Sequence, residues 1–142
     1  MRAAPLNDRY DGSCNIESNR YCDRYWIHVM WVVIVTPEFE QWFKAQSEQV
    51  QDEIAVAVGL LKERGPTLGR PFADSLRHTS VPNLKELRPR GAAQTIRILF
   101  AFDPSRRAVL LVGGDKSVGW SRWYPRAIRE AEALWARHLR NS

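Results

Sequence analysis

The stretch that decides the fold is TIRILFAFDPSRRAVLLVGG, residues 95–114. Within residues 96–102 every even-numbered residue is apolar and shares one face of a strand, while Arg97 falls on the other face. The Asp-Pro-Ser-Arg sequence at 103–106 is a strong turn signal. A second apolar run covers 108–112, and two glycines then end it. The stretch therefore predicts an antiparallel hairpin with one charged side chain in its first strand.

Working outward, residues 84–88 predict a further short strand, and the Pro-Arg-Gly sequence at 89–91 predicts the turn that joins it to the hairpin. Short connections make the three strands an antiparallel meander. The chain then ends in an amphipathic helix, which we expect to begin at Ser121 or Pro125 and to end near Leu139.

The segment before the meander predicts one strand and two helices. The β-branched run at 31–35 reads as a buried strand, and Thr36 followed by Pro is a typical helix start for residues 37–45. Ser47 caps a second helix with apolar residues at helical spacing, which ends at Gly65. Two helices with so short a break indicate an αα-hairpin.

The order of elements gives the fold class. Residues 66–83 contain three prolines and a glycine, and predict a long loop that is either packed or used for binding. A strand, a two-helix hairpin, a three-stranded antiparallel meander and a C-terminal helix make an α+β fold, because helices and strands come in runs.

Length and composition suit one domain. The chain has 142 residues, a net charge of +5 and 44% hydrophobic residues, and its two cysteines are too few for a disulfide scaffold. The uncharged apolar run at 26–35 is too short to span a bilayer, so we expect a cytoplasmic protein with no membrane partner. Residues 1–29 are polar and aperiodic, and predict a flexible extension before a domain at 30–142. Translation starting at Met30 is an open alternative.

Positive charge is concentrated in the second half of the chain. Residues 66–142 carry fourteen Lys and Arg against six Asp and Glu, and twelve of the fourteen are Arg. Such a surface attracts a polyanion, and guanidinium groups suit phosphate. A merely solvated basic surface is the alternative that charge alone leaves open.

A candidate site follows from the meander. Arg97 lies in an apolar strand, where a charge is costly unless it is paired or faces a cleft. Glu86 and Arg88 share one face of the neighbouring strand, so Arg88 and Arg97 converge. Glu86 then either neutralises one of them or serves as a base, and Lys116 can reach the same face from the end of the hairpin. A purely structural ion pair between Arg97 and Glu86 stays open.

Basic and aromatic residues alternate just after the hairpin. They are Trp120, Arg122, Trp123, Tyr124 and Arg126. Arginine contacts phosphates and aromatic rings stack on unpaired bases, so the pattern suits RNA. The alternative is that the rings pack the last helix against the sheet, which we favour for Trp123.

No metal or cofactor is expected. His78 and His138 have no partner at metal-ligand spacing, and Cys14, Cys22 and His28 form at best a partial set that we do not favour. The sequence also has neither a phosphate-binding loop nor a nucleophile motif.

The segments with the clearest family character are NLKELR (83–88), IRILFAF (96–102), GGDK (113–116), WY (123–124) and the start MWVV (30–33). In this order and spacing they resemble the RelE/ParE superfamily of type II toxin–antitoxin toxins, and within it the HigB-like, phage Gp49-like branch. The resemblance covers the chain from Met30 onward and implies the small RelE-like fold.

The resemblance implies a toxin that cuts mRNA on the ribosome and so stops translation. Its partners are then the ribosome, mRNA and a cognate antitoxin, often with a helix-turn-helix domain, and operator DNA is reached only through the antitoxin complex. A ParE-like inhibitor of DNA gyrase and a non-catalytic, phage-derived nucleic-acid-binding protein stay open as alternatives.

Roles for single residues come from the same resemblance. Cleavage by the adjacent 2′-OH needs a base, an acid and cations, and requires no metal. Arg88 and Arg97 would hold the scissile phosphate, Lys116 would add charge or a proton, and Lys85 or Glu86 would be the base. The residues expected to contact RNA are Tyr124, Arg122, Arg126, Trp120 and Arg90, with Tyr124 stacking on or orienting a base.

Overall fold

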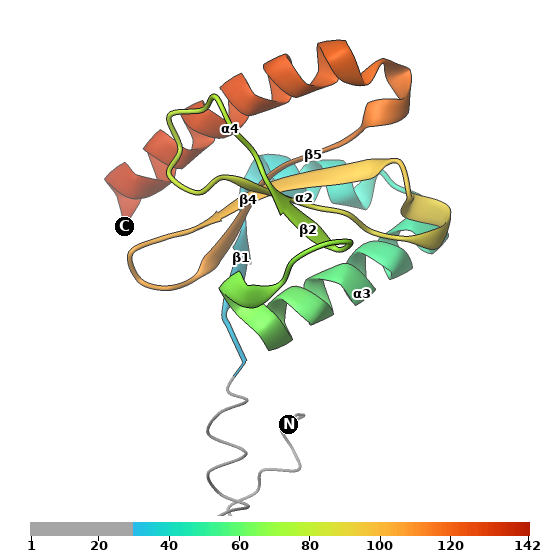
Figure 1. The fold of residues 1–142 in the computed structure, drawn as a ribbon, viewed down its shortest axis with the longest axis horizontal. Helices are drawn as coiled ribbons and strands as arrows, with labels where there is room; N and C mark the ends of the chain where they lie inside the picture. The colour runs from blue at the N-terminus through green and yellow to red at the C-terminus, as the bar shows by residue number, and fades with distance from the viewer. Residues whose placement is uncertain (1–29) are drawn as a thin grey trace, which may run out of the picture. The chain divides into compact units, whose positions relative to one another are not determined.

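A five-stranded sheet with the order β1-β5-β4-β3-β2 runs through residues 30–142, the part of the chain that the computed structural model describes (Figure 1). The strands are β1 (Val33–Val35), β2 (Ala73–Ser75), β3 (Lys85–Leu87), β4 (Ile96–Phe102) and β5 (Ala108–Asp115). Strand β1 pairs with β5 in parallel, and every other neighbouring pair is antiparallel. The predicted α+β class and the meander β3-β4-β5 are confirmed.

Three α-helices accompany the sheet within residues 30–142, namely α2 (Pro37–Lys44), α3 (Glu48–Arg64) and α4 (Trp120–Asn141). The predicted caps are present: the Thr36 hydroxyl accepts the Phe39 amide at 3.0 Å, and the Ser47 hydroxyl accepts the Val50 amide at 3.2 Å. Helix α3 ends at Arg64 with Gly65 as its C-cap, as expected. Helix α4 begins at Trp120, slightly earlier than the start predicted at Ser121 or Pro125.

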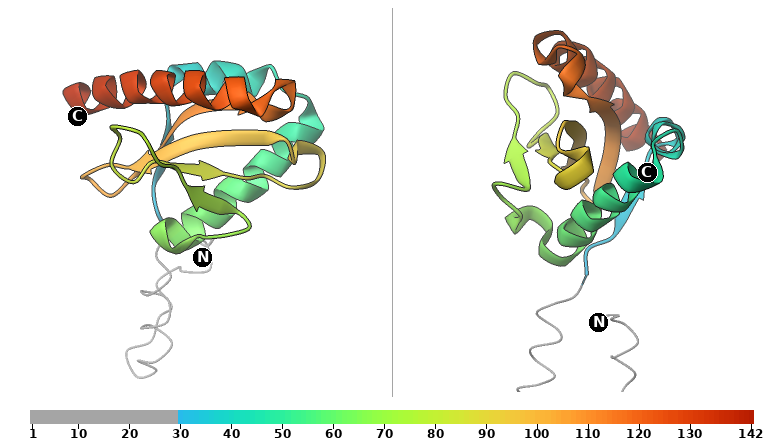
Figure 2. Two further views of the ribbon diagram at one scale, coloured as in Figure 1. Left: turned by 45° about the horizontal axis from the view of Figure 1, so that its top comes forward. Right: turned by 90° about the vertical axis from the view of Figure 1, so that its right-hand side faces the viewer.

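Helices cover both faces of the sheet, with α4 on one side and α2 and α3 on the other (Figure 2). Ile98 and Phe100 of β4 pack with the α2 and α3 residues in one hydrophobic core. Leu99 and Ala101 of the same strand pack with α4, including Trp135, in a second core. The alternation predicted for β4 is therefore confirmed, because successive side chains enter different cores.

The prediction that residues 66–83 form only a loop is wrong. They contain β2, in which Asp74 pairs with Glu86 of β3. A three-residue strand with two polar residues has no apolar period, so its pairing with β3 defines it. The rest of the segment packs on α4: Val81 is buried in the second core, and the Glu132 carboxylate accepts hydrogen bonds from the Thr79 hydroxyl and the Ser80 amide, both at 2.9 Å.

The two glycines predicted to end the last strand lie inside β5 instead. A Cβ at Gly113 would stand 2.4 Å from the Trp42 ring, and a Cβ at Gly114 would stand 2.2 Å from the Trp123 ring. Both positions therefore need glycine because an indole ring packs directly on the backbone, Trp42 from α2 and Trp123 from α4.

Two further expectations concern the N-terminal extension and membrane-spanning helices. The proposed extension at 1–29, with Cys14, Cys22 and His28, lies outside the described residues. Among residues 30–142, no helix has both the length and the apolar character to cross a bilayer.

Candidate active site

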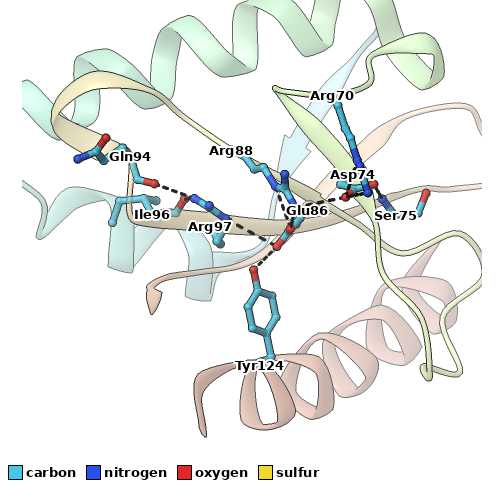
Figure 3. Close-up of polar contacts among 9 residues, drawn as sticks. All are labelled: Arg70, Asp74, Ser75, Glu86, Arg88, Gln94, Ile96, Arg97 and Tyr124. Carbon is cyan, nitrogen blue, oxygen red and sulfur yellow. Dashed lines mark hydrogen bonds and ion pairs between the residues drawn. The ribbon is translucent and has the colours of Figure 1, made fainter. Parts of the chain in front are cut away.

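The site residues come together on the α4 side of the sheet (Figure 3). Glu86 pairs with Leu99 in the β3–β4 register, and Leu99 faces α4, so the Glu86 side chain points to the same side. Arg97 is two residues from Leu99 along β4 and shares that face. Arg88, directly after β3, and Tyr124, near the start of α4, complete the group. The predicted convergence of Arg88 and Arg97 is thus present.

Glu86 is the centre of this group. Its side chain is only 4% exposed, and its Oε2 accepts hydrogen bonds from Arg88 Nε at 2.9 Å and Arg88 Nη2 at 2.7 Å. Its Oε1 accepts a short hydrogen bond from the Tyr124 hydroxyl and lies 3.9 Å from Arg97 Nε (Figure 3). One buried carboxylate therefore contacts side chains from three parts of the fold, namely the segment after β3, strand β4 and helix α4.

Arg97 is held mainly by backbone. Its side chain is 12% exposed, and its Nη1 donates to the carbonyl oxygens of Gln94 at 2.9 Å and Ile96 at 2.7 Å. Its Nε is buried without a hydrogen bond in the described structure. Glu86 is then the anion that compensates a nearly buried guanidinium, which is costly to leave unpaired.

The charge network continues from Arg88 into β2. Arg88 Nη2 also lies 3.3 Å from Asp74 Oδ2, and Arg70 Nε donates to the same oxygen at 3.1 Å. The hydrogen bond from Arg70 lowers the pKa of Asp74. Burial alone would lower the pKa of Arg88, but its hydrogen bonds to Glu86 together with the negative charges of Glu86 and Asp74 outweigh burial and raise that pKa. Both groups therefore stay charged.

A polar cavity of about 310 Å³ opens beside this network. Its lining consists of Pro71, Arg88, Pro89, Arg90, Gly91, Gln94 and Arg97. Three of these residues are arginines, and none is acidic. A phosphate-sized anion entering the cavity would therefore meet guanidinium groups from the β3–β4 connection and from β4 itself.

Tyr124 is fixed by its hydroxyl. Burial and the contact with Glu86 raise its pKa, so the hydroxyl remains a proton donor near neutral pH. The ring also meets the Trp123 indole edge to face, with centroids 4.9 Å apart. Trp123 itself packs on the second core, in agreement with the packing role favoured for it.

Other predicted site residues lie apart from the cavity. Lys85 pairs with Phe100, which belongs to the α3 side, and Lys85 Nζ donates to the Pro66 carbonyl at 3.2 Å. Lys85 thus points away from Glu86, and its expected role as a base is not supported by its position. Lys116 follows β5 directly, and its side chain makes no hydrogen bond or ion pair within residues 30–142.

The basic residues at the start of α4 are open to solvent. Arg122 and Arg126 are exposed one turn apart, and their side chains have no hydrogen bond or ion pair within the described chain. Trp120 is the first residue of α4, and its side chain is not among those described. Like charges at this spacing, near the positive end of a helix, are unfavourable by themselves. An anionic partner would relieve that cost.

Sequence reasoning missed Asp74, Arg70 and the Gln94 carbonyl. Their roles depend on β2 and on the turn before β4, which carry no periodic signal. No group of three potential metal ligands occurs in the part of the chain that the structure describes.

The fold and the site define a small α+β protein with an arginine-lined cavity beside a buried carboxylate. The family described as "Phage derived protein Gp49-like (DUF891)" matches residues 41–136, and the chain belongs to this family. Two relatives from Mycobacterium tuberculosis (strain ATCC 25618 / H37Rv) carry toxin names. HigB3 is 48% identical over 100 residues, 70% of this chain and 86% of HigB3. HigB2 is 38% identical over 69% of this chain and 49% of HigB2.

Solved structures support the fold. A mutant of the E. coli toxin RelE in its free state is similar with a TM-score of 0.53 and 11% identity, over 70% of this chain and 96% of RelE. A chain of the archaeal RelE–RelB complex from Pyrococcus horikoshii OT3 gives a TM-score of 0.50 and 12% identity, over 61% of this chain and 96% of that one. The predicted RelE-like fold is confirmed.

Proposed function

We propose that this protein is the toxin of a type II toxin–antitoxin system and that it stops translation by cutting mRNA on the ribosome. The observation that carries the proposal is the cavity into which Arg88, Arg90 and Arg97 converge. Guanidinium groups held around a small cavity suit the pentavalent phosphorane that forms when a ribose 2′-OH attacks the neighbouring phosphorus. The 5′-oxygen leaves with a proton, and the products carry a 2′,3′-cyclic phosphate and a 5′-hydroxyl.

The surroundings of the cavity agree with an RNA substrate. Arg122 and Arg126 add unpaired positive charge on α4. The chemistry by way of the 2′-OH needs no metal, because fixed cations can neutralise the developing charge. The proposed chemistry requires RNA, since only RNA carries the 2′-OH.

A protein antitoxin is the partner that follows from this function. One of the structural relatives was solved as a RelE–RelB complex. We propose that a cognate antitoxin, of the helix-turn-helix type often found with this family, silences the present chain, and that operator DNA is bound through that complex.

The test is expression of the chain from an inducible promoter, with and without the neighbouring gene. Expression alone should arrest growth and produce mRNA fragments with 5′-hydroxyl ends inside translated regions. Arg88→Ala and Arg97→Ala should relieve the arrest, whereas Arg140→Ala, an exposed arginine at the far end of α4, should not. DNA damage with intact mRNA would indicate a gyrase inhibitor, and RNA binding without toxicity would indicate a non-catalytic protein; either result contradicts the proposal.

A further inference from the structure

Glu86 lies behind the arginines and not in the cavity. The cavity lining includes Arg88 and Arg97 but not Glu86, whose side chain is only 4% exposed. A carboxylate at the cavity surface would repel an RNA phosphate. A carboxylate one layer deeper leaves the positive groups facing the ligand and compensates their charge from behind.

Both oxygens of Glu86 are already occupied. Oε2 accepts two hydrogen bonds from Arg88, and Oε1 accepts one from the Tyr124 hydroxyl. A general base needs a lone pair within about 2.6–3.2 Å of the proton that it removes. With a side chain that is 4% exposed, hydrogen bonds to both oxygens and no place in the cavity lining, Glu86 is poorly positioned to reach a hydroxyl in the cavity.

The same contacts explain what Glu86 does for its neighbours. Arginine side chains lose considerable rotamer freedom when they are fixed. If an anion already orders two of them in the folded protein, substrate binding no longer has to bear this loss of entropy. Arg88 follows β3, Arg97 lies in β4, and Tyr124 comes from α4. The backbone carbonyls hold Arg97 through Nη1, and its buried Nε, which has no hydrogen bond in the described structure, lies 3.9 Å from Glu86 Oε1. Glu86 is therefore the anion that faces the Nε side of this guanidinium.

We infer that Glu86 is a positioning residue, whose buried carboxylate fixes Arg88, Arg97 and Tyr124 for an RNA phosphate without taking a proton from the substrate. This inference rests on the proposed function and deepens it. Of the two residues from which the sequence left the base to be chosen, Lys85 faces the other side of the sheet and Glu86 supports the arginines. Catalysis in this chain then relies on fixed positive charge around the phosphate.

The decisive measurement is the pH dependence of RNA cleavage by the full chain under single-turnover conditions. Glu86→Gln keeps the shape of the side chain, and we expect the rate to fall about 10- to 100-fold. This is less than the roughly 10²- to 10³-fold loss for a group that contacts the transition state directly, because Glu86 acts through the arginines. The acidic limb of the wild-type pH profile should persist in the variant. A variant whose rate no longer depends on pH on the acidic side would show that Glu86 is the base and would overturn the inference.

Tyr124→Phe gives a second variant that is less at risk of unfolding. It removes the hydroxyl and keeps the ring that contacts Trp123. Because this hydroxyl acts through Glu86, the double variant should be no slower than Glu86→Gln alone. Multiplied losses in the double variant would place the Tyr124 hydroxyl on the substrate and contradict the positioning role.

A measurement that does not depend on RNA cleavage separates this inference from the proposed function. In ¹⁵N NMR spectra of the full chain, the Nε–H groups of Arg88 and Arg97 should exchange slowly with water. Glu86→Gln should accelerate that exchange at least about tenfold, as expected when hydrogen-bonded or paired groups are released. Unchanged exchange would overturn the inference even if the wild type cleaves mRNA, and a wild type that cleaves no RNA would overturn the proposed function alone.

Discussion

Two buried carboxylates lie on the α4 side of this sheet, and the difference between them shows what makes a site. Counted as whole residues, Glu86 and Asp103 are 3% and 5% exposed. Each contacts an arginine and a residue of α4. Asp103 Oδ2 lies 2.9 Å from both Arg107 Nε and His138 Nε2, while its Oδ1 accepts the Arg107 amide at 2.9 Å. These contacts close the β4–β5 turn onto the C-terminal end of α4.

The two clusters differ in charge balance. Asp103 is matched by one arginine, which comes from its own turn. Around Glu86 and Asp74, by contrast, stand the three guanidinium groups of Arg70, Arg88 and Arg97, and two of these line a polar cavity. Burial of a carboxylate therefore does not mark a functional site here. We propose that a surplus of fixed positive charge beside a cavity does.

The largest effect should come from removing a guanidinium at the cavity. Arg97→Ala should lower RNA cleavage about 10²- to 10³-fold, because a preorganised charge contact with the transition state is lost. Arg107→Ala, which removes the arginine of the other carboxylate, should leave the rate per folded molecule nearly unchanged. Single-turnover rates normalised to the folded fraction give the comparison, and equal losses in both variants would remove the distinction between the two clusters.

For stability we expect the opposite: the Asp103 cluster should contribute more to the free energy of unfolding than to RNA cleavage. Asp103→Asn should lower the free energy of unfolding by about 3 kcal/mol, because Arg107 and His138 lose a buried charged partner. Burial alone would raise the pKa of Asp103, but hydrogen bonds from His138 and Arg107 outweigh it and lower the pKa. The contribution is therefore present above the unfolded pKa and is lost as pH falls through the lower folded value.

Urea denaturation between pH 7 and pH 2 measures this difference, since the gap between wild type and Asp103→Asn should narrow only at the acidic end. The folded variant should retain RNA cleavage. A variant that is as stable as the wild type at neutral pH would show that the Asp103 contacts contribute little.

The sequence predicted the centre of the site because short connections and a period of two determine which side chains share a face. Arg97, Glu86 and Arg88 were placed together on that basis, and the contacts confirm the placement. The same period also puts Lys85 on the face opposite Glu86, which argues against Lys85 as a base for the same site. Asp74 could not be found in this way, because β2 is short and polar and forms through its partner strand.

The glycine pair shows a further limit of sequence reasoning. Consecutive glycines usually end a strand, and here they continue it because two indole rings occupy the space of the missing Cβ atoms. That contact joins residues far apart in sequence, so no local pattern reveals it. The same two glycines allow the two faces of the sheet to be compared directly.

Gly113→Ala and Gly114→Ala should each cost about 1–3 kcal/mol of stability, because the new methyl group overlaps an indole ring. Gly114 pairs with Arg97, and the ring displaced there is Trp123, which contacts Tyr124. Gly114→Ala should therefore also slow RNA cleavage per folded molecule, while Gly113→Ala, which displaces Trp42 on the other face, should not. Equal cleavage by both variants would show that the α4 side does not control the geometry of the site.

The smallest effect should come from an exposed ion pair beside the Asp103 cluster. Arg137 donates to both oxygens of Glu38 at 2.8 and 2.7 Å and so joins the end of α4 to α2, but both side chains are more than a third exposed. Hydrogen bonding by Arg137 lowers the pKa of Glu38 to about 2 from an ordinary value of 4.5. Because solvent screens such a pair, Arg137→Ala should lower the stability much less than Asp103→Asn does.

The pH dependence of the stability lost in Arg137→Ala shows whether the ion pair with Glu38 is its cause. A lowered carboxylate pKa gives stability that is present above pH 4.5 and is lost as the pH falls towards 2. The difference in urea midpoint between wild type and Arg137→Ala should therefore shrink over this range, and added salt should reduce it at neutral pH. A cost as large as that of Asp103→Asn, or one that is independent of pH and salt, would mean that packing of the arginine stem matters more than its charge. The contrast between buried and exposed carboxylates at this end of α4 would then fail.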